Sequence, residues 1–263
     1  MNKKLGFALG AGGARGVAHI GFLKAMEENG IIPDYISGSS MGSVVGSCYA
    51  SGMSPEEMMS EVEKLKPSEI FEWSLNPVGN GALMRTNKMK KKLEKYLGDK
   101  TFDQLKIPFS AVAADLVSGE TYAFSGDRKV LDFVTASSSI PGVFCPTYVE
   151  GKVLVDGGVG TRVPVNEVRE MGADVVVAVD VLGEVQPLDK RYNMLTVMLR
   201  MFEIMDSHLC SRKMKKYRPN LLLHPDLGDM SQYKFKDLRM AFDKGYEVGM
   251  KNAHKIKKLL SED

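Results

Sequence analysis

Apolar runs and amphipathic stretches alternate over the first fifty residues of the chain. Residues 4–9 (KLGFAL) are short, apolar and followed by glycines, which predicts a buried strand. From residue 15 to 29 the apolar positions recur at helical spacing, and Gly30 ends that run. A second short strand at residues 34–37 precedes a helix of small residues at 41–52. This order of strand, helix, strand and helix predicts a parallel α/β sheet.

The pattern changes at residues 54–106, which are Met-rich and charged and surround a loop with the sequence NPVGNG. We interpret this segment as a helical insertion that covers the site as a mobile flap hinged at the loop, with a fixed helical layer as the alternative. C-terminal helices are predicted from about residue 190 onwards. Further strands are predicted at residues 107–116, 118–124, 152–158, 173–181 and 220–224, and helices at 130–139, 191–217 and 234–260.

Length and composition favour a single domain over residues 1–263. The chain is 44% hydrophobic, and no Pro/Ser-rich linker or low-complexity tract divides it. Its 35 basic and 33 acidic residues give a net charge of +2, which favours no nucleic-acid partner. No apolar run approaches the roughly 20 residues of a membrane span. The composition leaves the oligomeric state open.

The first residues and the cysteines indicate a cytoplasmic protein. The start, MNKKLGFALGAGGARG, superficially resembles a signal peptide, but its apolar core is short, rich in glycine and interrupted by Arg15. We interpret it as a strand and a turn. Cys48, Cys145 and Cys210 are far apart and odd in number, which argues against a disulfide framework or a zinc site and suits a reducing compartment.

A glycine-rich segment, GAGGARG at residues 10–16, connects the first predicted strand to the first predicted helix. It fails the dinucleotide-binding pattern Gly-x-Gly-x-x-Gly, because Arg15 takes the third glycine position when the pattern starts at Gly10. Successive backbone N–H groups at a helix N-terminus still favour an anion, and an oxyanion satisfies them as well as a phosphate does. A tight turn without a ligand is the alternative.

The segment GSSMG at residues 38–42 fits the pattern Gly-x-Ser-x-Gly and joins the second predicted strand to the second predicted helix. In such a nucleophile elbow, Gly38 and Gly42 relieve crowding while Ser40 stands on a strained turn. The helix N-terminus favours negative charge on the serine oxygen. The two glycine-containing turns then lie at the carboxyl ends of neighbouring strands, where open α/β sheets place their sites.

A serine nucleophile needs a base, and four histidines are the first candidates. We expect His19 to be packed inside the first helix, and His208 and His254 to be solvated in charged helical stretches. His224 ends a predicted strand and is the most suitable of the four. None of them lies in a motif.

Strand-end carboxylates are the other candidates for the base. Asp156 ends a predicted strand and precedes two glycines, which permit an unusual backbone and close approach. A simple Asp-Gly-Gly turn is the alternative. Asp115 and Asp180 also follow predicted strands; we assign them to turns or the surface, and they are the main competitors of Asp156.

Together and in this order, GAGGARG, GSSMG and the DGG of residues 156–158 resemble the patatin-like phospholipase family. HIGFLKAMEENGI, AADLVSGE, SSSIPGVF and GADVVVAVDV extend the resemblance to roughly residues 4–182. The resemblance implies a three-layer α/β/α fold with a mostly parallel central sheet. It also implies a Ser-Asp dyad that cleaves acyl esters of lipids without histidine, metal or organic cofactor.

Carried over position by position, the resemblance implies that Ser40 is the nucleophile and Asp156 the general base. It implies that Gly12 and Gly13 are the backbone donors of the oxyanion hole. Arg15 matches the basic residue that follows these donors, where it either contacts the substrate or braces the loop.

The chain departs from the family pattern at two places. Ala11 stands where a third glycine is usual, which is tolerated if this position needs no positive φ. Thr161-Arg162 stands where many bacterial relatives have Asn-Pro, and this departure concerns the shape of the pocket rather than the dyad.

The resulting hypothesis is a serine acyl hydrolase of the phospholipase A, lysophospholipase or esterase type, acting on a lipid or another acyl ester. A non-catalytic lipid-binding or regulatory protein and a nucleotide-binding enzyme are the alternatives. The Met-rich stretches of residues 54–106 and the basic run of residues 212–218 also predict weak peripheral attachment to anionic bilayers, although such clusters more often form core or solvated surface.

Overall fold

A computed structural model describes residues 3–185 and 193–261 of the chain. At its centre lies a sheet with the strand order β11-β10-β1-β2-β5-β9-β8, and β6 pairs with β5. Strands β11, β10, β1, β2 and β5 run parallel, whereas β6, β8 and β9 are antiparallel to their neighbours. The mostly parallel α/β sheet predicted from the sequence is therefore confirmed.

The strands of this sheet are short, and β1, β5 and β10 are buried along their whole length. A parallel strand that is covered on both faces has this continuous apolar character, which is why the sequence pattern could locate β1 and β10. The strands are β1 (Leu5–Leu9), β2 (Tyr35–Ser39), β5 (Phe109–Asp115), β6 (Thr121–Phe124), β8 (Thr147–Val149), β9 (Lys152–Asp156), β10 (Val175–Val179) and β11 (Leu221–Leu223).

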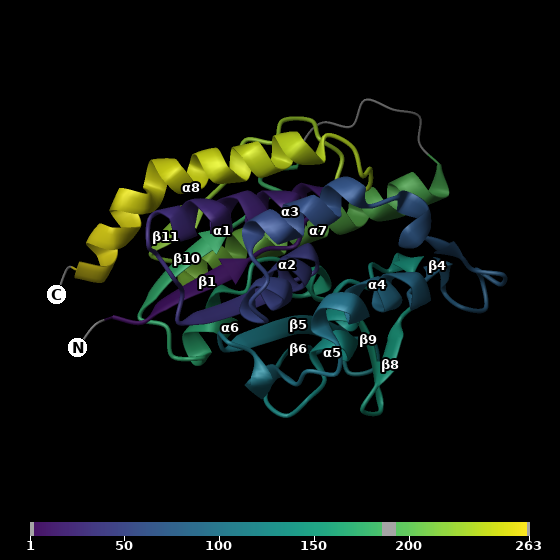
Figure 1. Cartoon of the computed structure of the whole chain (residues 1–263). Helices are drawn as coiled ribbons and strands as arrows, with labels where there is room; N and C mark the ends of the chain where they lie inside the picture. Colours follow the sequence, from purple (N-terminus) through teal and green to yellow (C-terminus); the bar gives the residue numbers. More distant parts are fainter. Residues whose placement is uncertain (1–2, 186–192, 262–263) are drawn as a thin grey trace.

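Helices cover both faces of the sheet, which gives the expected three layers (Figure 1). The larger core forms against α1 (Ala18–Glu28), α2 (Met41–Ala50), α5 (Val130–Ser137) and α8 (Leu238–Ser261). A smaller core on the other face packs α6 (Val165–Glu170) and the second half of α7 (Met194–Tyr217) against β1 and β10. The start predicted for this helix, at about residue 191, lies outside the described residues.

The insertion of residues 54–106 is only partly helical. It runs through α3 (Pro55–Lys64), the 3₁₀ turn η2 (Pro67–Glu69), β3 (Glu72–Trp73), β4 (Ala82–Arg85), α4 (Asn87–Leu97) and η3 (Phe102–Gln104). The two strands form an antiparallel hairpin around the NPVGNG loop, and β4 pairs with β7 (Gly142–Phe144) in a second, three-stranded sheet. Strands this short show no hydrophobic periodicity, so the sequence pattern did not indicate them.

Candidate active site

Ser40 stands at the sharp turn between β2 and α2. Its backbone has φ 53° and ψ −125°, a region that non-glycine residues rarely occupy, so the turn is strained. A Cβ atom on Gly42 would lie 2.1 Å from the Leu9 carbonyl oxygen, which restricts that position to glycine. The Ser40 N–H donates a hydrogen bond of 2.9 Å to Ser137 Oγ. The local geometry is that of a nucleophile elbow.

Asp156 lies beside Ser40 because β5 holds the strands of both residues. In the sheet register, Ser39 pairs with Val112 of β5, and Asp156 pairs with the next residue, Ala113. Ser40 Oγ donates a hydrogen bond of 2.5 Å to Asp156 Oδ2. Both side chains are buried. The structure thus brings together a serine and a carboxylate that are far apart in the sequence.

The surroundings of Asp156 make its carboxylate a stronger base than a solvated one. Burial raises the pKa of Asp156 to about 6, while the hydrogen bonds from Ser40 and from the Gly158 N–H act in the opposite direction. The Gly158 N–H lies 2.8 Å from Asp156 Oδ1 and holds the carboxylate in place. A carboxyl with a pKa near neutrality is suited to general-base catalysis.

The glycine loop after β1 has two backbone N–H groups available for a ligand. Among the described residues, the N–H groups of Gly12 and Gly13 have no hydrogen-bond partner, whereas those of Gly10, Ala11 and Ala14 bind backbone carbonyls. Gly13 has φ +51° and begins the 3₁₀ turn η1 (Gly13–Val17). Gly13 and Ser40 line the same cavity. Free N–H groups beside a serine are what an oxyanion hole requires.

Ala11, the first departure from the family pattern, causes no strain. It does not have a positive φ, so the missing glycine is tolerated at this position.

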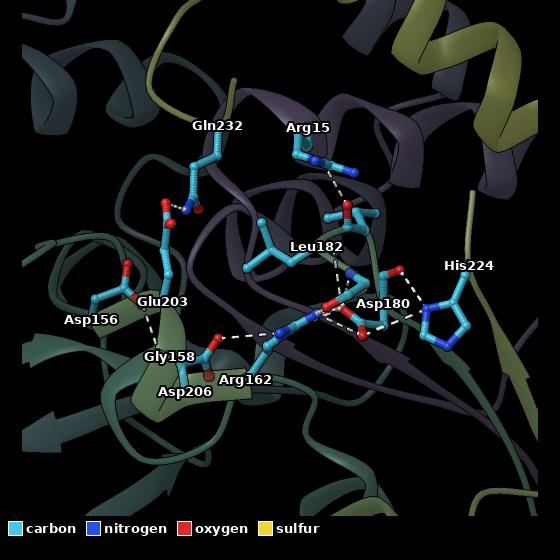
Figure 2. Close-up of polar contacts among 12 residues, drawn as sticks. Arg15, Asp156, Gly158, Arg162, Asp180, Leu182, Glu203, Asp206, His224 and Gln232 are labelled. Carbon is cyan, nitrogen blue, oxygen red and sulfur yellow. Dashed lines mark hydrogen bonds and ion pairs between the residues drawn. The ribbon is translucent and has the colours of Figure 1, made fainter. Parts of the chain in front are cut away.

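The Arg15 side chain binds backbone carbonyls of two other segments and thereby supports the glycine loop. Its Nε donates to the Val181 carbonyl (2.8 Å) and its Nη1 to the Met230 carbonyl (3.3 Å). Figure 2 shows its guanidinium on the other side of the view from Asp156. These bonds join the glycine loop to the segments after β10 and before α8. A contact of Arg15 with the substrate stays a prediction.

None of the four histidines forms a hydrogen bond with Ser40 or Asp156 in the described part of the chain. His19 is fully buried, its Nε2 lies 2.8 Å from the Gly10 carbonyl, and burial lowers its pKa to about 4. His224 Nδ1 lies 3.2 Å from the Asp180 carbonyl, outside the dyad. His208 and His254 are exposed, as expected.

Arg162 occupies a buried ion cluster that the sequence analysis did not identify. Its Nη2 lies 2.7 and 2.8 Å from the two carboxylate oxygens of Asp180, and its Nη1 lies 3.4 Å from Asp206 Oδ2 (Figure 2). The assignment of Asp180 to the surface or a simple turn is therefore wrong. Burial raises the pKa of Asp206 to about 7, although Arg162 acts to lower it. Charged residues inside otherwise apolar stretches were the available signal.

Asp115 is the last residue of β5 and is buried, so its assignment to the surface or a turn is wrong, although its side chain binds the turn that follows. Its Oδ1 accepts hydrogen bonds from the N–H groups of Val117 (3.2 Å) and Val153 (3.3 Å), and its Oδ2 accepts one from Ser118 Oγ (2.9 Å). Burial acts to raise the pKa of Asp115, and these hydrogen bonds outweigh it, so the pKa is lowered. Over residues 3–185 and 193–261, no cluster of His, Cys, Asp or Glu could hold a metal ion.

An apolar cavity of about 380 Å³ opens next to Ser40. Its walls come from α2, α3, β4, α4 and the segments around residues 138–144 and 232–238. Met58 and Met59 of α3 are buried, while Met84 and Met89 line the cavity. These methionines of the insertion therefore pack into the core or line the cavity, and the membrane attachment predicted from the sequence stays a prediction.

Comparisons with known proteins agree with this arrangement. The family model of patatin-like phospholipases matches residues 7–169. An NTE family protein of Mycobacterium tuberculosis is 36% identical over 181 residues, which are 68% of this chain and 49% of that protein. A lysophospholipase of Aspergillus fumigatus is 33% identical over 182 residues, which are 68% of this chain and 12% of that protein. The chain thus spans about half the length of the first relative and much less of the second.

The fold also matches a solved structure. VipD from Legionella pneumophila aligns with a TM-score of 0.55 at 14% sequence identity, covering 97% of this chain and 67% of that chain. At this identity the likeness concerns the fold alone.

Proposed function

Because the chain belongs to the patatin-like phospholipase family, we propose that it hydrolyses acyl esters of lipids with Ser40 as nucleophile and Asp156 as general base. The observation that carries this proposal is the hydrogen bond of 2.5 Å between Ser40 Oγ and Asp156 Oδ2 beside an apolar cavity. The lysophospholipase name of the fungal relatives supports a lipid ester as the substrate. Phospholipase A, lysophospholipase and esterase activities all use this chemistry.

The reaction proceeds in two halves. Ser40 Oγ attacks the ester carbonyl carbon while Asp156 Oδ2 accepts the hydroxyl proton, and the alcohol part leaves with that proton. The N–H groups of Gly12 and Gly13 bind the oxyanion, each such donor being worth on the order of 10²–10³ in rate. Water then attacks the acyl-Ser40 ester while Asp156 takes its proton. As the ester bond breaks and the fatty acid leaves, Asp156 returns this proton to Ser40 Oγ.

The apolar cavity supports a substrate that carries an acyl chain, because such a chain would fit inside it. Its walls are made mainly of apolar side chains from α2, α3 and α4, which exclude water from a bound chain. The polar groups at its edge include Tyr96, whose hydroxyl donates a hydrogen bond of 2.5 Å to Glu61 Oε2. The three cysteines carry free thiols, which agrees with action in the cytoplasm.

Substitution of the dyad tests the proposal. We expect Ser40→Ala and Asp156→Asn each to lower hydrolysis of a chromogenic short-chain ester by about 10³-fold or more, with an unchanged circular dichroism spectrum. A fluorophosphonate lipid probe should label Ser40 in the unsubstituted protein and should not label the Ser40→Ala variant.

Histidine substitutions are the matched controls. Replacing His19, His208, His224 or His254 singly by Gln should leave most of the activity, because none of them contacts the dyad. A fully active Asp156→Asn variant, or a folded but inactive His224→Gln variant, would overturn the dyad.

A non-catalytic lipid-binding protein is the second candidate, because the cavity could hold an acyl chain without turnover. Saturable binding of a fatty acid, together with neither hydrolysis nor probe labelling, would favour this alternative over the hydrolase.

A further inference from the structure

Helix α7 presents an apolar face to solvent over its first half. Met194, Met201 and Met205 are 81%, 56% and 63% exposed, and Val197 and Met198 are exposed between them. At 100° per residue these five positions fall within one side of the helix. Contiguous exposed apolar patches on soluble proteins mark contact surfaces for proteins or membranes.

The same side of α7 becomes basic in the second half of the helix. Arg212, Lys215 and Lys216 continue the angular position of the apolar stripe, and all three are exposed. Within the described part of the chain none of them forms an ion pair with a carboxylate. The acidic residues Glu203 and Asp206 lie on the opposite side, where they bind Gln232 and Arg162.

This surface is continuous with the candidate active site. Leu199, on the buried side of the apolar half of α7, lines the cavity that contains Ser40. The β3–β4 hairpin adds exposed Trp73, Leu75 and Val78, while its Leu83 lines the same cavity. Figure 1 shows this hairpin and the start of α7 at the same end of the molecule.

We propose that the exposed face of α7, together with the tip of the β3–β4 hairpin, docks onto the surface of a bilayer that contains anionic lipids. The apolar half suits the boundary between headgroups and acyl chains, and the basic half suits anionic headgroups. None of the helices in the described ranges is long and apolar enough to cross a membrane. The docking deepens the proposed function and rests on it for its purpose, which is to bring lipid esters to the cavity.

A second copy of the chain fits this face less well than a bilayer does. Paired side by side in parallel, two copies of α7 would place like charges of Arg212, Lys215 and Lys216 opposite each other. In the antiparallel arrangement, the basic half of each helix would meet the apolar half of its partner and lose hydration without gaining a counter-charge.

Vesicle sedimentation with the Ser40→Ala variant of the 263-residue chain tests the proposal without turnover of the lipid. The vesicles contain phosphatidylcholine alone or phosphatidylcholine mixed with phosphatidylglycerol. We expect binding to the mixed vesicles that weakens as salt is raised. Met201→Glu/Met205→Glu and Arg212→Glu/Lys216→Glu should each lower the partition coefficient at least about tenfold.

Two double variants elsewhere are matched controls. Leu116→Glu/Val117→Glu changes exposed apolar residues after β5, and Lys251→Glu/Lys255→Glu changes exposed lysines of α8 on the opposite side of the sheet. Both should bind vesicles like the parent chain. The proposal would be overturned if the parent chain did not bind the mixed vesicles, or if the control variants lost as much vesicle binding as the α7 variants.

The readouts separate this surface from the proposed hydrolase. With an intact Ser40, the α7 variants should cleave a soluble short-chain ester at the parent rate. If the parent chain cleaves the ester but does not bind vesicles, only the docking surface is refuted. If it binds vesicles but cleaves no ester, only the proposed hydrolase activity is refuted. A dimer in lipid-free ultracentrifugation that the Met201→Glu/Met205→Glu variant lacks would assign the face to a second copy instead.

Discussion

Replacing Asp156 by Asn should stabilise the fold while it removes the proposed base. The Asp156 carboxylate is buried, and its pKa rises from 3.8 to about 6 in the folded chain. Each unit of pKa difference corresponds to about 1.4 kcal/mol, so the ionised carboxylate lowers the free energy of unfolding by about 3 kcal/mol above pH 6. A neutral amide of the same size carries no such penalty.

The amide can keep both hydrogen bonds of the carboxylate. Its oxygen can accept from the Gly158 N–H, and its NH₂ group can donate to Ser40 Oγ, which now acts as an acceptor. Unfolding entropies of about 2.1 cal/mol/K per residue convert a gain of about 3 kcal/mol into a rise in Tm of about 5 °C for a chain of 263 residues.

The pH dependence identifies the cause of this gain. Because the folded pKa of Asp156 is raised, the unsubstituted chain gains stability as the pH falls from about 6 to about 4, and the Asn variant does not. The difference in Tm between the Asn variant and the unsubstituted chain should therefore be largest near pH 8 and should disappear near pH 4. His19, whose pKa is lowered to about 4, makes both proteins less stable as the pH falls below 6.5, so its effect cancels in the difference.

Calorimetric unfolding of both proteins between about pH 4 and pH 8 measures this difference. Asp115→Asn is the matched control, and its effect on the free energy of unfolding should have the opposite sign. Hydrogen bonds lower the pKa of the buried Asp115 carboxyl, so loss of the ionised carboxylate should destabilise the fold near pH 8. An Asp156→Asn variant that is less stable than the parent near pH 8, or a difference independent of pH, would refute the reasoning.

Four further predictions concern the reaction, the cavity, the insertion and the ion cluster. The kcat/KM of ester hydrolysis should fall about tenfold per pH unit below about pH 6, since protonation of Asp156 removes the base. Met89→Trp should fill part of the cavity, so that kcat/KM drops at least about tenfold for long-chain p-nitrophenyl esters and little for the acetate. Hydrogen exchange should be slow in α3 and α4, which contribute buried side chains to the main core, and uniform fast exchange there would support a mobile flap. Arg162→Met should lower the free energy of unfolding by about 3–5 kcal/mol in calorimetry, because it leaves Asp180 and Asp206 without their cation.

Most of the main sheet could be predicted from sequence because its strands are short and mainly apolar, whereas its edge strand β8, with only three residues, was not predicted. Val175–Val179 is buried throughout, and the alternating strands and helices around it leave few topologies open. The small sheet could not be predicted, since β3, β4 and β7 are too short to show a period. Their pairing depends on tertiary contacts around the cavity.

The dyad and the ion cluster differ in what the sequence could reveal. Ser40 and Asp156 lie in recognisable motifs, but their contact depends on the register of β5 with both β2 and β9. Arg162 lies in no motif, and its carboxylate partners are 18 and 44 residues further along the chain. Only the burial of these charges in the folded chain identifies them as a unit.

Arg162 connects the two halves of the proposed catalytic site. Its side chain binds Asp180, directly after β10, and its carbonyl accepts the Ala11 N–H at 2.8 Å, while the Val179 carbonyl at the end of β10 accepts the Gly10 N–H. The segment from Asp156 to Arg162 therefore joins the base to the loop that carries the oxyanion donors. If this connection positions the loop, Arg162→Met should lower the kcat of the protein that remains folded. The fall of kcat/KM below about pH 6 should stay at the same pH, because the carboxylate of Asp156 keeps its own hydrogen bonds. If kcat is unchanged, or if the fall of kcat/KM moves to another pH, the role of Arg162 is limited to stability.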